Sequence, residues 1–505
     1  MAHSAEGSPA RRESLESGPQ PPRFSLPHRE KKYFLVWCSL LLLVAAGLRL
    51  YALGQNSLWV DEYRSLLTAR FPLTDIPAAA LSRDAFEPPV YFWLLHLVIW
   101  LFGDSEVALR FLSAIAGAIT APLAGFLFRG LGVDARAAIG GAALLALSPL
   151  HLWYSQEARP YALLVCLGVG ALACFLRARA TGSSFAWVGF GVLASLAVLT
   201  HVTGLVFVLL AWMWGLTRPR QPLARGLVIS SASILLAIAP FGYQLAQAVS
   251  HAEGKGSPPR DLTGLEMPYT LFTYLAGFSF GPSVRDIQER GPWAAVWLHP
   301  VESALGVLAL LAVIALALRL RGTVVTRLML LTLVPMTATW IGSALTGKAY
   351  NVRYTLPGII GFLGLVALCA SELPRPRRSI AIVALAALLL WADLQWFFTP
   401  GYWKDDSRSA VAWMQAELPP KSTVAVAPGY QTGVLRYYAE HLGAQFSFDS
   451  LPEAAAVLDS PPEVLLISRT QHLPHWRELV RSLNRTTEAS LAVEFIGYRI
   501  YRGPR

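Results

Sequence analysis

The sequence predicts a multi-span α-helical membrane protein that ends in a small α/β domain. Of the 505 residues, 54% are hydrophobic and only 15% are charged, whereas soluble domains average about 25% charged residues. Apolar stretches close to the roughly 20 residues that cross a bilayer recur along most of the chain. They stop near residue 397, where the charged fraction rises. We therefore expect a membrane module over 34–397 and a separate domain over 398–505.

About eleven apolar stretches are expected to cross the membrane. Some of them are shorter than a bilayer requires, so neighbouring residues must extend them or the lipid must thin around them. The expected spans are 34–53, 106–128, 137–150, 161–176, 185–199, 202–216, 226–246, 301–318, 328–345, 354–372 and 379–397.

The chain begins with a segment that we expect to be a disordered cytoplasmic tail. Residues 1–33 are rich in Ser, Pro, Gly, Glu and Arg, a composition that cannot bury a core. The apolar run that follows starts too late and is too long for a cleaved signal peptide, so we expect a retained anchor. All four cysteines fall inside expected spans, which argues against a disulfide framework and against a cysteine metal site.

The distribution of Lys and Arg predicts the orientation of the chain in the membrane. One set of alternate loops holds 13 basic residues in 39 positions, the opposite set holds 11 in 127, and six more precede the first span. Because basic residues are concentrated in cytoplasmic loops, we expect the N-terminus inside the cell and residues 55–105 and 398–505 outside the inner membrane. The net charge of +10 then reflects topology and not a nucleic-acid surface.

Residues 398–505 alternate short apolar runs with helical patterns, which predicts a small α/β domain. We expect strands at 424–427, 464–468 and 498–501, and helices at 407–417, 431–441 and 474–483. No catalytic signature stands out in this region, so we expect a lid, docking or scaffold domain.

Two adjacent carboxylates, Asp61 and Glu62, follow the first span by a few residues. In the expected orientation they lie at the water edge of the bundle, in a large outer loop over 55–105. The same loop carries Glu87 and Tyr91, which flank a Pro-Pro pair. The aromatic stretch that follows, of about 14 residues, is short for a span. Its Tyr and Trp content is typical of an interfacial helix on the outer leaflet.

Three more polar clusters fall on the same side of the membrane. Ionisable groups at such depth are costly and tend to be functional. Structural interpretations also remain open: a helix-end ion pair between Glu157 and Arg159, a solvated histidine in a turn, or an arginine that snorkels to lipid phosphate. The residues are Glu157, Arg159 and Tyr161; His201 after Thr200; and Lys348, Arg353 and Tyr354.

The order and topology of these motifs resemble the GT-C glycosyltransferases, and among them the bacterial form of family 39, which holds protein O-mannosyltransferases and aminoarabinose transferases. The resemblance covers about residues 34–400. One departure stands out, because a His or Lys commonly precedes the Pro-Pro pair in the family and Glu87 stands there in this chain. The matching segments are 59–62, 88–91, 156–161, 199–201, 277–283 and 353–357, with 403–413 similar to the start of the family's outer domain.

The resemblance implies a polyprenyl-phosphate sugar donor and an extracytoplasmic protein, glycolipid or polysaccharide acceptor. In such a transfer the leaving phosphate gains charge, which fixed arginines stabilise, and the acceptor hydroxyl benefits from a carboxylate base. We expect Asp61 to be that base, with Glu62 and Glu157 as further catalytic carboxylates and Glu157 orienting Arg159. The expected donor-phosphate ligands are Arg159, Arg353 and Lys348, and the expected cleft residues are Glu87, Tyr91, Tyr161, His201 and Tyr354.

No cofactor is certain from the sequence. Asp61, Glu62, Glu157 and His201 could hold a divalent cation if the fold gathers them, so the metal question stays open at this point.

Two other classes of protein compete with the enzyme. A transporter or flippase of a lipid-linked sugar would also have many spans, but transporters place their coupling groups near the bilayer midplane in broken helices. The carboxylates of this chain lie in outer loops, and no internal repeat is seen. An acceptor-binding or scaffold protein is the third class, and residues 398–505 offer no recognisable binding motif for it. The sequence therefore favours the enzyme.

Overall fold

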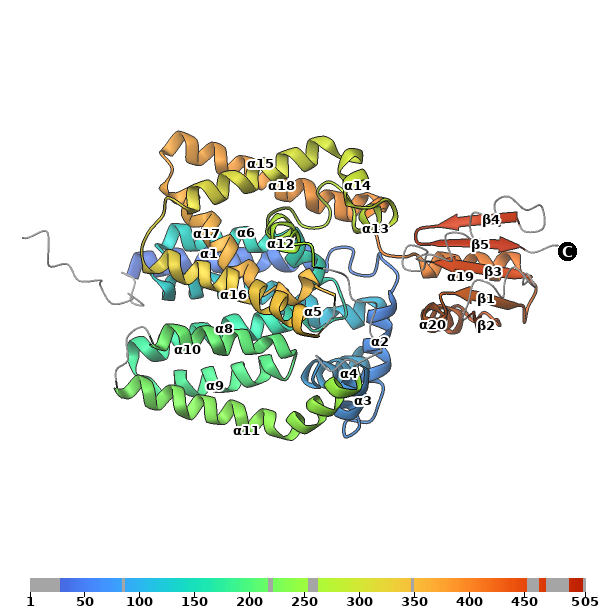
Figure 1. Ribbon diagram of the computed structural model, residues 1–505, viewed down its shortest axis with the longest axis horizontal. Helices are drawn as coiled ribbons and strands as arrows, with labels where there is room; N and C mark the ends of the chain where they lie inside the picture. Colours follow the sequence, from blue (N-terminus) through green and yellow to red (C-terminus); the bar gives the residue numbers. More distant parts are fainter. Residues whose placement is uncertain are drawn as a thin grey trace, which may run out of the picture.

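The computed structural model describes residues 28–83, 87–216, 221–252, 262–346, 349–451, 463–468 and 490–502. Figure 1 shows a bundle of long helices with a small sheet domain at one end of it. The helix α1 begins at His28, earlier than the expected start of the first span at residue 34. The tail expected before it lies, up to residue 27, outside the described residues.

Each expected span coincides with a helix, except that the third is split between two. The helices are α1 His28–Leu50, α5 Glu106–Leu131, α6 Ala135–Ala146, α7 Pro149–Ser155, α8 Tyr161–Thr181, α9 Ser184–Val198, α10 Leu205–Leu216, α11 Gln221–Ala252, α15 Pro300–Ala317, α16 Thr323–Thr346, α17 Gly358–Glu372 and α18 Arg375–Phe398. The multi-span helical class is thereby confirmed.

Not all of these helices are long and apolar enough to cross a bilayer. Within the described residues, six helices are long and apolar enough to cross a bilayer, and α6 with α7, which meet at a bend of 54°, add a seventh if they act as one. Three other apolar helices, α9, α10 and α17, have only 15, 12 and 15 residues, fewer than the roughly 20 that a full crossing needs. The expected count of eleven is not confirmed.

The helix α5 lies at the centre of this bundle and packs against α1, α6, α7 and α8. Its buried face is rich in Ala and Gly, which lets neighbouring helices approach closely. At Gly117 the approach is closest, since a Cβ atom there would lie 2.1 Å from Oγ of Ser155. This contact fixes the end of α7 against α5, and with it the segment that carries Glu157 and Arg159.

Short helices cover the end of the bundle that is nearest the sheet domain (Figure 1). The expected interfacial helix is α4, and its exposed side chains include Leu97, Trp100 and Phe102. Its position on a lipid leaflet stays a prediction. The short helices are α2 Val60–Ala69, α3 Ile76–Arg83, α4 Val90–Phe102, α12 Glu266–Ala276, α13 Val284–Arg290 and α14 Pro292–Leu298, with 3₁₀ turns η2 Val202–Gly204, η3 Val352–Thr355 and η4 Pro400–Tyr402.

The C-terminal domain is a five-stranded mixed sheet with two described helices, as an α/β domain requires. The strand order is β2-β1-β3-β5-β4, where β1 runs parallel to β2 and β3, and β5 runs antiparallel to β3 and β4. The three expected strands are confirmed, and the helix expected at 474–483 lies outside the described residues. The elements are β1 Thr423–Ala427, β2 Ser447–Ser450, β3 Val464–Ser468, β4 Ser490–Phe495, β5 Tyr498–Arg502, α19 Ser407–Glu417 and α20 Thr432–Leu442, with a 3₁₀ turn η5 Gly429–Gln431.

The C-terminal domain touches the chain just before α2. The hydroxyl of Tyr438 accepts a hydrogen bond from the N–H of Leu58 at 2.6 Å, and the hydroxyl of Ser57 donates to Asp406 at 3.1 Å. An ion pair of 2.7 Å joins Arg408 to Glu106. These contacts place the domain beside the first turn of α2.

Candidate active site

The first turn of α2 carries the two adjacent carboxylates. Acidic side chains are favourable there because the helix N-terminus bears partial positive charge. The N–H of Trp59 donates to Oε2 of Glu62 at 3.4 Å, which is half of a capping box. Successive residues of a helix point about 100° apart, so Glu62 faces the bundle while Asp61 remains partly exposed.

Glu62 is held in a fixed position by Arg110 of α5. Both carboxylate oxygens contact the guanidinium at 2.8 Å, and the N–H of Ala158 donates to Oε1 at 2.9 Å. Neither side chain has more than 1% of its surface exposed. Burial opposes ionisation, but Arg110 and Lys404 outweigh it and lower the pKa of Glu62 to about 2. This geometry favours a structural role over the catalytic role that we expected from the sequence.

Removing either member of the Glu62–Arg110 pair is expected to destabilise the protein by about 3–5 kcal/mol, because the remaining charge stays buried without its partner. The substitutions Glu62→Gln and Arg110→Met, measured by thermal unfolding in detergent, test this expectation. The exposed pair Arg499–Glu494, at 3.0 Å, is the matched control, since surface pairs contribute about 0–1 kcal/mol. Wild-type unfolding temperatures in both buried variants would contradict the structural role.

Asp61 faces a different partner. Its Oδ2 atom lies 2.8 Å from Nη1 of Arg353, which η3 supplies, and its side chain is 17% exposed. Arg64 approaches the other oxygen at 3.7 Å. Burial raises the pKa of Asp61, but Arg159 and Arg353 outweigh that effect and hold it at about 2. Asp61 is therefore ionised and partly exposed, with Arg353 as its nearest cation and Arg64 farther away.

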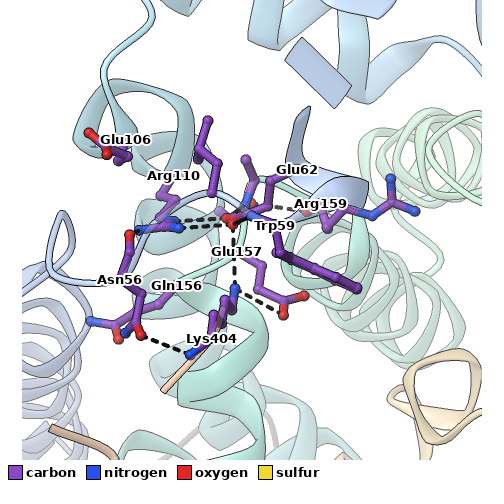
Figure 2. A network of polar contacts seen from close by, with 12 residues as sticks. Asn56, Trp59, Glu62, Glu106, Arg110, Gln156, Glu157, Arg159 and Lys404 are labelled. Atoms are coloured by element: carbon purple, nitrogen blue, oxygen red, sulfur yellow. Dashed lines mark hydrogen bonds and ion pairs between the residues drawn. The ribbon is translucent and has the colours of Figure 1, made fainter. Parts of the chain in front are cut away.

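Arg159 pairs with Glu87 and not with Glu157. Its Nη2 atom contacts Oε1 of Glu87, and its Nη1 atom donates to the carbonyl of Asp61 at 3.2 Å. The expectation that Glu157 orients Arg159 is wrong, because the two side chains leave the chain in different directions (Figure 2). The carboxylate that contacts the Arg159 guanidinium is that of Glu87.

Three aromatic rings surround the two arginines. The guanidinium carbons of Arg159 and Arg353 lie 5.7 and 5.8 Å from the centre of the Tyr161 ring, within the range of cation–π attraction. The rings of Tyr354 and Tyr161 both lie 5.5 Å from the imidazole of His201. The expected cleft residues Tyr161, His201 and Tyr354 therefore meet the expected phosphate-binding arginines.

His201 is a neutral hydrogen-bond donor in this cluster. Its Nδ1 atom accepts from the N–H of Thr203 at 3.2 Å, which assigns the ring proton to Nε2. Burial, together with Arg159 and Arg353, lowers the pKa of His201 to about 3. The imidazole stays uncharged at neutral pH.

Three buried N–H donors of this cluster have no hydrogen-bond partner in the described part of the chain: Nε of Arg159, Nε of Arg353 and Nε2 of His201. Buried donors without partners are rare in proteins. Since all three side chains surround the Tyr161 ring, the cluster is suited to a ligand that carries several acceptor oxygens. Charge-assisted hydrogen bonds favour an anionic one.

Lys404 belongs to the site although no sequence motif assigned it a role. It follows η4, in the segment that leads into the C-terminal domain, and its side chain is 4% exposed. Its Nζ atom lies 3.1 Å from Oε1 of Glu157 and 3.6 Å from Oε2 of Glu62, as Figure 2 shows. Burial raises the pKa of Glu157, and Lys404 opposes that rise. Because some 250 residues of sequence separate Glu157 and Lys404, no local pattern could have paired them.

The remaining expected residues take other places. Tyr91 is buried, and its hydroxyl lies 3.2 Å from that of Ser113, which donates to the carbonyl of Arg159 at 3.0 Å. Lys348 lies outside the described residues. Within the described ranges, no group of three or more His, Cys, Asp or Glu side chains is arranged to hold a metal ion. Asp61, Glu62 and Glu157 each contact a cation instead.

Comparisons with known proteins agree with the motif order. Residues 86–243 match the family model described as dolichyl-phosphate-mannose-protein mannosyltransferase. An undecaprenyl phosphate-alpha-4-amino-4-deoxy-L-arabinose arabinosyl transferase of Pseudomonas fluorescens is 29% identical over 214 residues, which are 40% of this chain and 39% of that protein. An uncharacterized protein of Aquifex aeolicus is 27% identical over 26% of each chain. The chain thus spans well under half the length of these curated relatives.

The fold agrees over a much longer stretch. ArnT from Cupriavidus metallidurans in the apo state superimposes with a TM-score of 0.57 over 93% of this chain and 99% of that chain, at 14% identity. The same protein bound to undecaprenyl phosphate gives a TM-score of 0.51 with the same coverage, at 13% identity. The fold of this chain, a multi-span helical bundle with a small sheet domain, is thus similar to that of these two structures. The family-model match over residues 86–243 and the arabinosyl transferase relative support the resemblance to GT-C glycosyltransferases that the motifs predicted.

Proposed function

We propose that this protein transfers a sugar from a polyprenyl-phosphate donor to an acceptor hydroxyl group at the outer face of the inner membrane. The observation that carries the proposal is the cluster of unpartnered N–H donors on Arg159, Arg353 and His201 beside the accessible carboxylate of Asp61. The oxygens of a phosphate can accept hydrogen bonds from these N–H groups, and the carboxylate of Asp61 can accept the proton of an acceptor hydroxyl group. The proposal is also supported by the relatives, one of which is named for an undecaprenyl phosphate sugar and another of which has been solved with undecaprenyl phosphate.

In the proposed reaction the acceptor oxygen attacks the anomeric carbon of the sugar, and the bond from that carbon to the phosphate oxygen breaks. The polyprenyl phosphate leaves with the electron pair, and the hydroxyl proton passes to Asp61. Negative charge grows on the leaving phosphate, where fixed cations and N–H donors lower the barrier. Arg159 and Arg353 supply the cations, and neutral His201 supplies a further donor.

Because Asp61 pairs with Arg353, binding of the donor phosphate would also change the pKa of Asp61. A base whose pKa is about 2 is weak at neutral pH, because catalytic bases work best near the operating pH. A donor phosphate on Arg353 would compete with Asp61 for the guanidinium. Losing this partner would raise the pKa of Asp61. Donor binding would therefore prepare the base for the acceptor.

Purified protein in liposomes, supplied with a labelled polyprenyl-phosphate sugar, tests the proposal. Mannose, named in the description of the matching family model, and 4-amino-4-deoxy-L-arabinose, named for one relative, are the first donor sugars to try, with protein, glycolipid and polysaccharide acceptors. Labelled product that depends on Asp61 would support the transferase. Movement of the intact donor across the bilayer without product would instead support the alternative, a flippase or transporter.

The orientation proposed for the chain can be tested with reporter fusions. A reporter that is active only in the cytoplasm should be silent after Arg505 and active when inserted within 219–224, because basic loops stay inside the cell. A reporter that is active only outside should give the opposite pattern at the same two sites. If the cytoplasmic reporter were active after Arg505 and silent within 219–224, the carboxylates would lie on the cytoplasmic side, which would contradict the proposed reaction.

A further inference from the structure

The segment that joins the membrane bundle to the C-terminal domain places a buried cation in the candidate site. This segment is residues 399–406, which follow α18, include η4 and end before α19. We propose that Lys404 is a positioning residue of the transfer site, through which the C-terminal domain holds Glu157 and the first turn of α2 in their active arrangement. The inference rests on the proposed function and assigns part of it to a residue outside the membrane bundle.

The first argument is the pairing of carboxylates with cations at the site. Three carboxylates of the site already have a guanidinium partner, in the pairs Glu62–Arg110, Glu87–Arg159 and Asp61–Arg353. The fourth carboxylate, that of Glu157, is 3% exposed and has Lys404 at 3.1 Å. A buried carboxylate without a partner is strongly unfavourable. Lys404 therefore completes the pairing of four carboxylates with four cations.

The second argument is the way the lysine itself is enclosed. Its ammonium nitrogen lies 5.7 Å from the centre of the Trp59 ring and 6.0 Å from that of Trp153. The indole N–H of Trp153 donates to the same Glu157 oxygen, at 2.9 Å. A cation between two indole faces is attracted to both of them. Because Trp59 directly precedes α2 and Trp153 lies in α7, Lys404 links α2, which carries Asp61 and Glu62, to the helix that ends just before Glu157.

The third argument is that the same segment and its domain hold the chain just before α2. The N–H of Lys404 donates to Oδ1 of Asn56 at 3.0 Å. The hydroxyl of Ser57 donates to Asp406, and the N–H of Leu58 donates to Tyr438. The three residues before Trp59 are thus hydrogen-bonded to the linking segment and to the C-terminal domain. A shift of this domain would move Asp61 and Glu62 with it.

Amide hydrogen exchange and transfer kinetics on the full chain test the proposal together. In Lys404→Met, peptides that cover 54–63 and 151–158 should exchange faster than in the wild type. The kcat should fall about 10²-fold, the size of loss that a small misplacement of reacting groups causes. The apparent KM for the donor should change far less, because the lost interaction matters in the transition state. Lys404→Arg, which keeps the charge, should restore much of the kcat.

The matched control is Lys421→Met, an exposed lysine of the same domain, which should leave exchange and turnover at wild-type values. Tyr438→Phe serves if Lys404→Met fails to fold, and it should raise exchange around Leu58 and lower the kcat. Unchanged exchange in Lys404→Met, or faster exchange with full turnover, would overturn the proposal. If the wild type transfers no sugar, the proposed function fails, whereas the exchange results still decide whether Lys404 holds these segments.

Discussion

Asp61→Asn is expected to lower the turnover of sugar transfer by about 10²-fold or more, the usual contribution of a positioned general base. Asparagine has the shape of aspartate but accepts no proton at neutral pH. Binding of the donor should not weaken, because the amide no longer competes for Arg353 through an ion pair of 2.8 Å. The measurement is steady-state transfer from a polyprenyl-phosphate sugar, with donor binding determined separately.

Asp75→Asn is the control for this prediction. Asp75 lies on the same loop, is exposed and contacts the hydroxyl of Thr74, so its loss should leave turnover unchanged. Retention of normal turnover in Asp61→Asn would mean that another group accepts the proton. A loss of folded protein equal to the loss of turnover would mean that Asp61 acts in folding.

Arg353→Ala and Arg159→Ala should each lower kcat/KM for the donor by about tenfold to hundredfold, since hydrogen bonds to charged groups contribute about 1.5–3 kcal/mol. Arg353→Lys keeps the charge but loses the planar fork that matches phosphate, so a measurable part of the loss should remain. Titration of the lipid donor against each variant at fixed acceptor concentration gives these values.

The control here is Arg64→Ala. Arg64 lies 3.7 Å from Asp61, but its side chain is 57% exposed, and it is outside the cluster around Tyr161. Its removal should change donor use little, because exposed charges are screened by solvent. If both Arg159→Ala and Arg353→Ala kept normal affinity and turnover, these arginines would be structural anchors and the phosphate would bind elsewhere.

The class of protein could be predicted because its signals are local in sequence. An apolar stretch determines its own helix in a membrane, since every backbone polar group must be satisfied within the segment. Alternating apolar runs likewise predicted β1, β3 and β5, whose sheet pairing the structure provides. The motif order was enough to indicate a resemblance to the GT-C family, and the helices bring Asp61, Arg159, His201 and Arg353 to one end of the bundle. Those roles remain proposals.

The partners of the charged residues could not be predicted in the same way. Burying a charge without a partner is unfavourable, so the sequence is enough to predict that carboxylates and cations buried at one site form pairs. Which cation it meets depends on helix packing between distant segments: Asp61 pairs with Arg353 across 292 residues of sequence, and Arg159 pairs with Glu87 and not with the nearby Glu157. Lys404 reaches Glu157 from the segment that follows α18, some 250 residues farther along the chain. The sequence by itself determined that charges gather at this site, and the tertiary structure decided how they pair, because pairing depends on distances that no local pattern encodes.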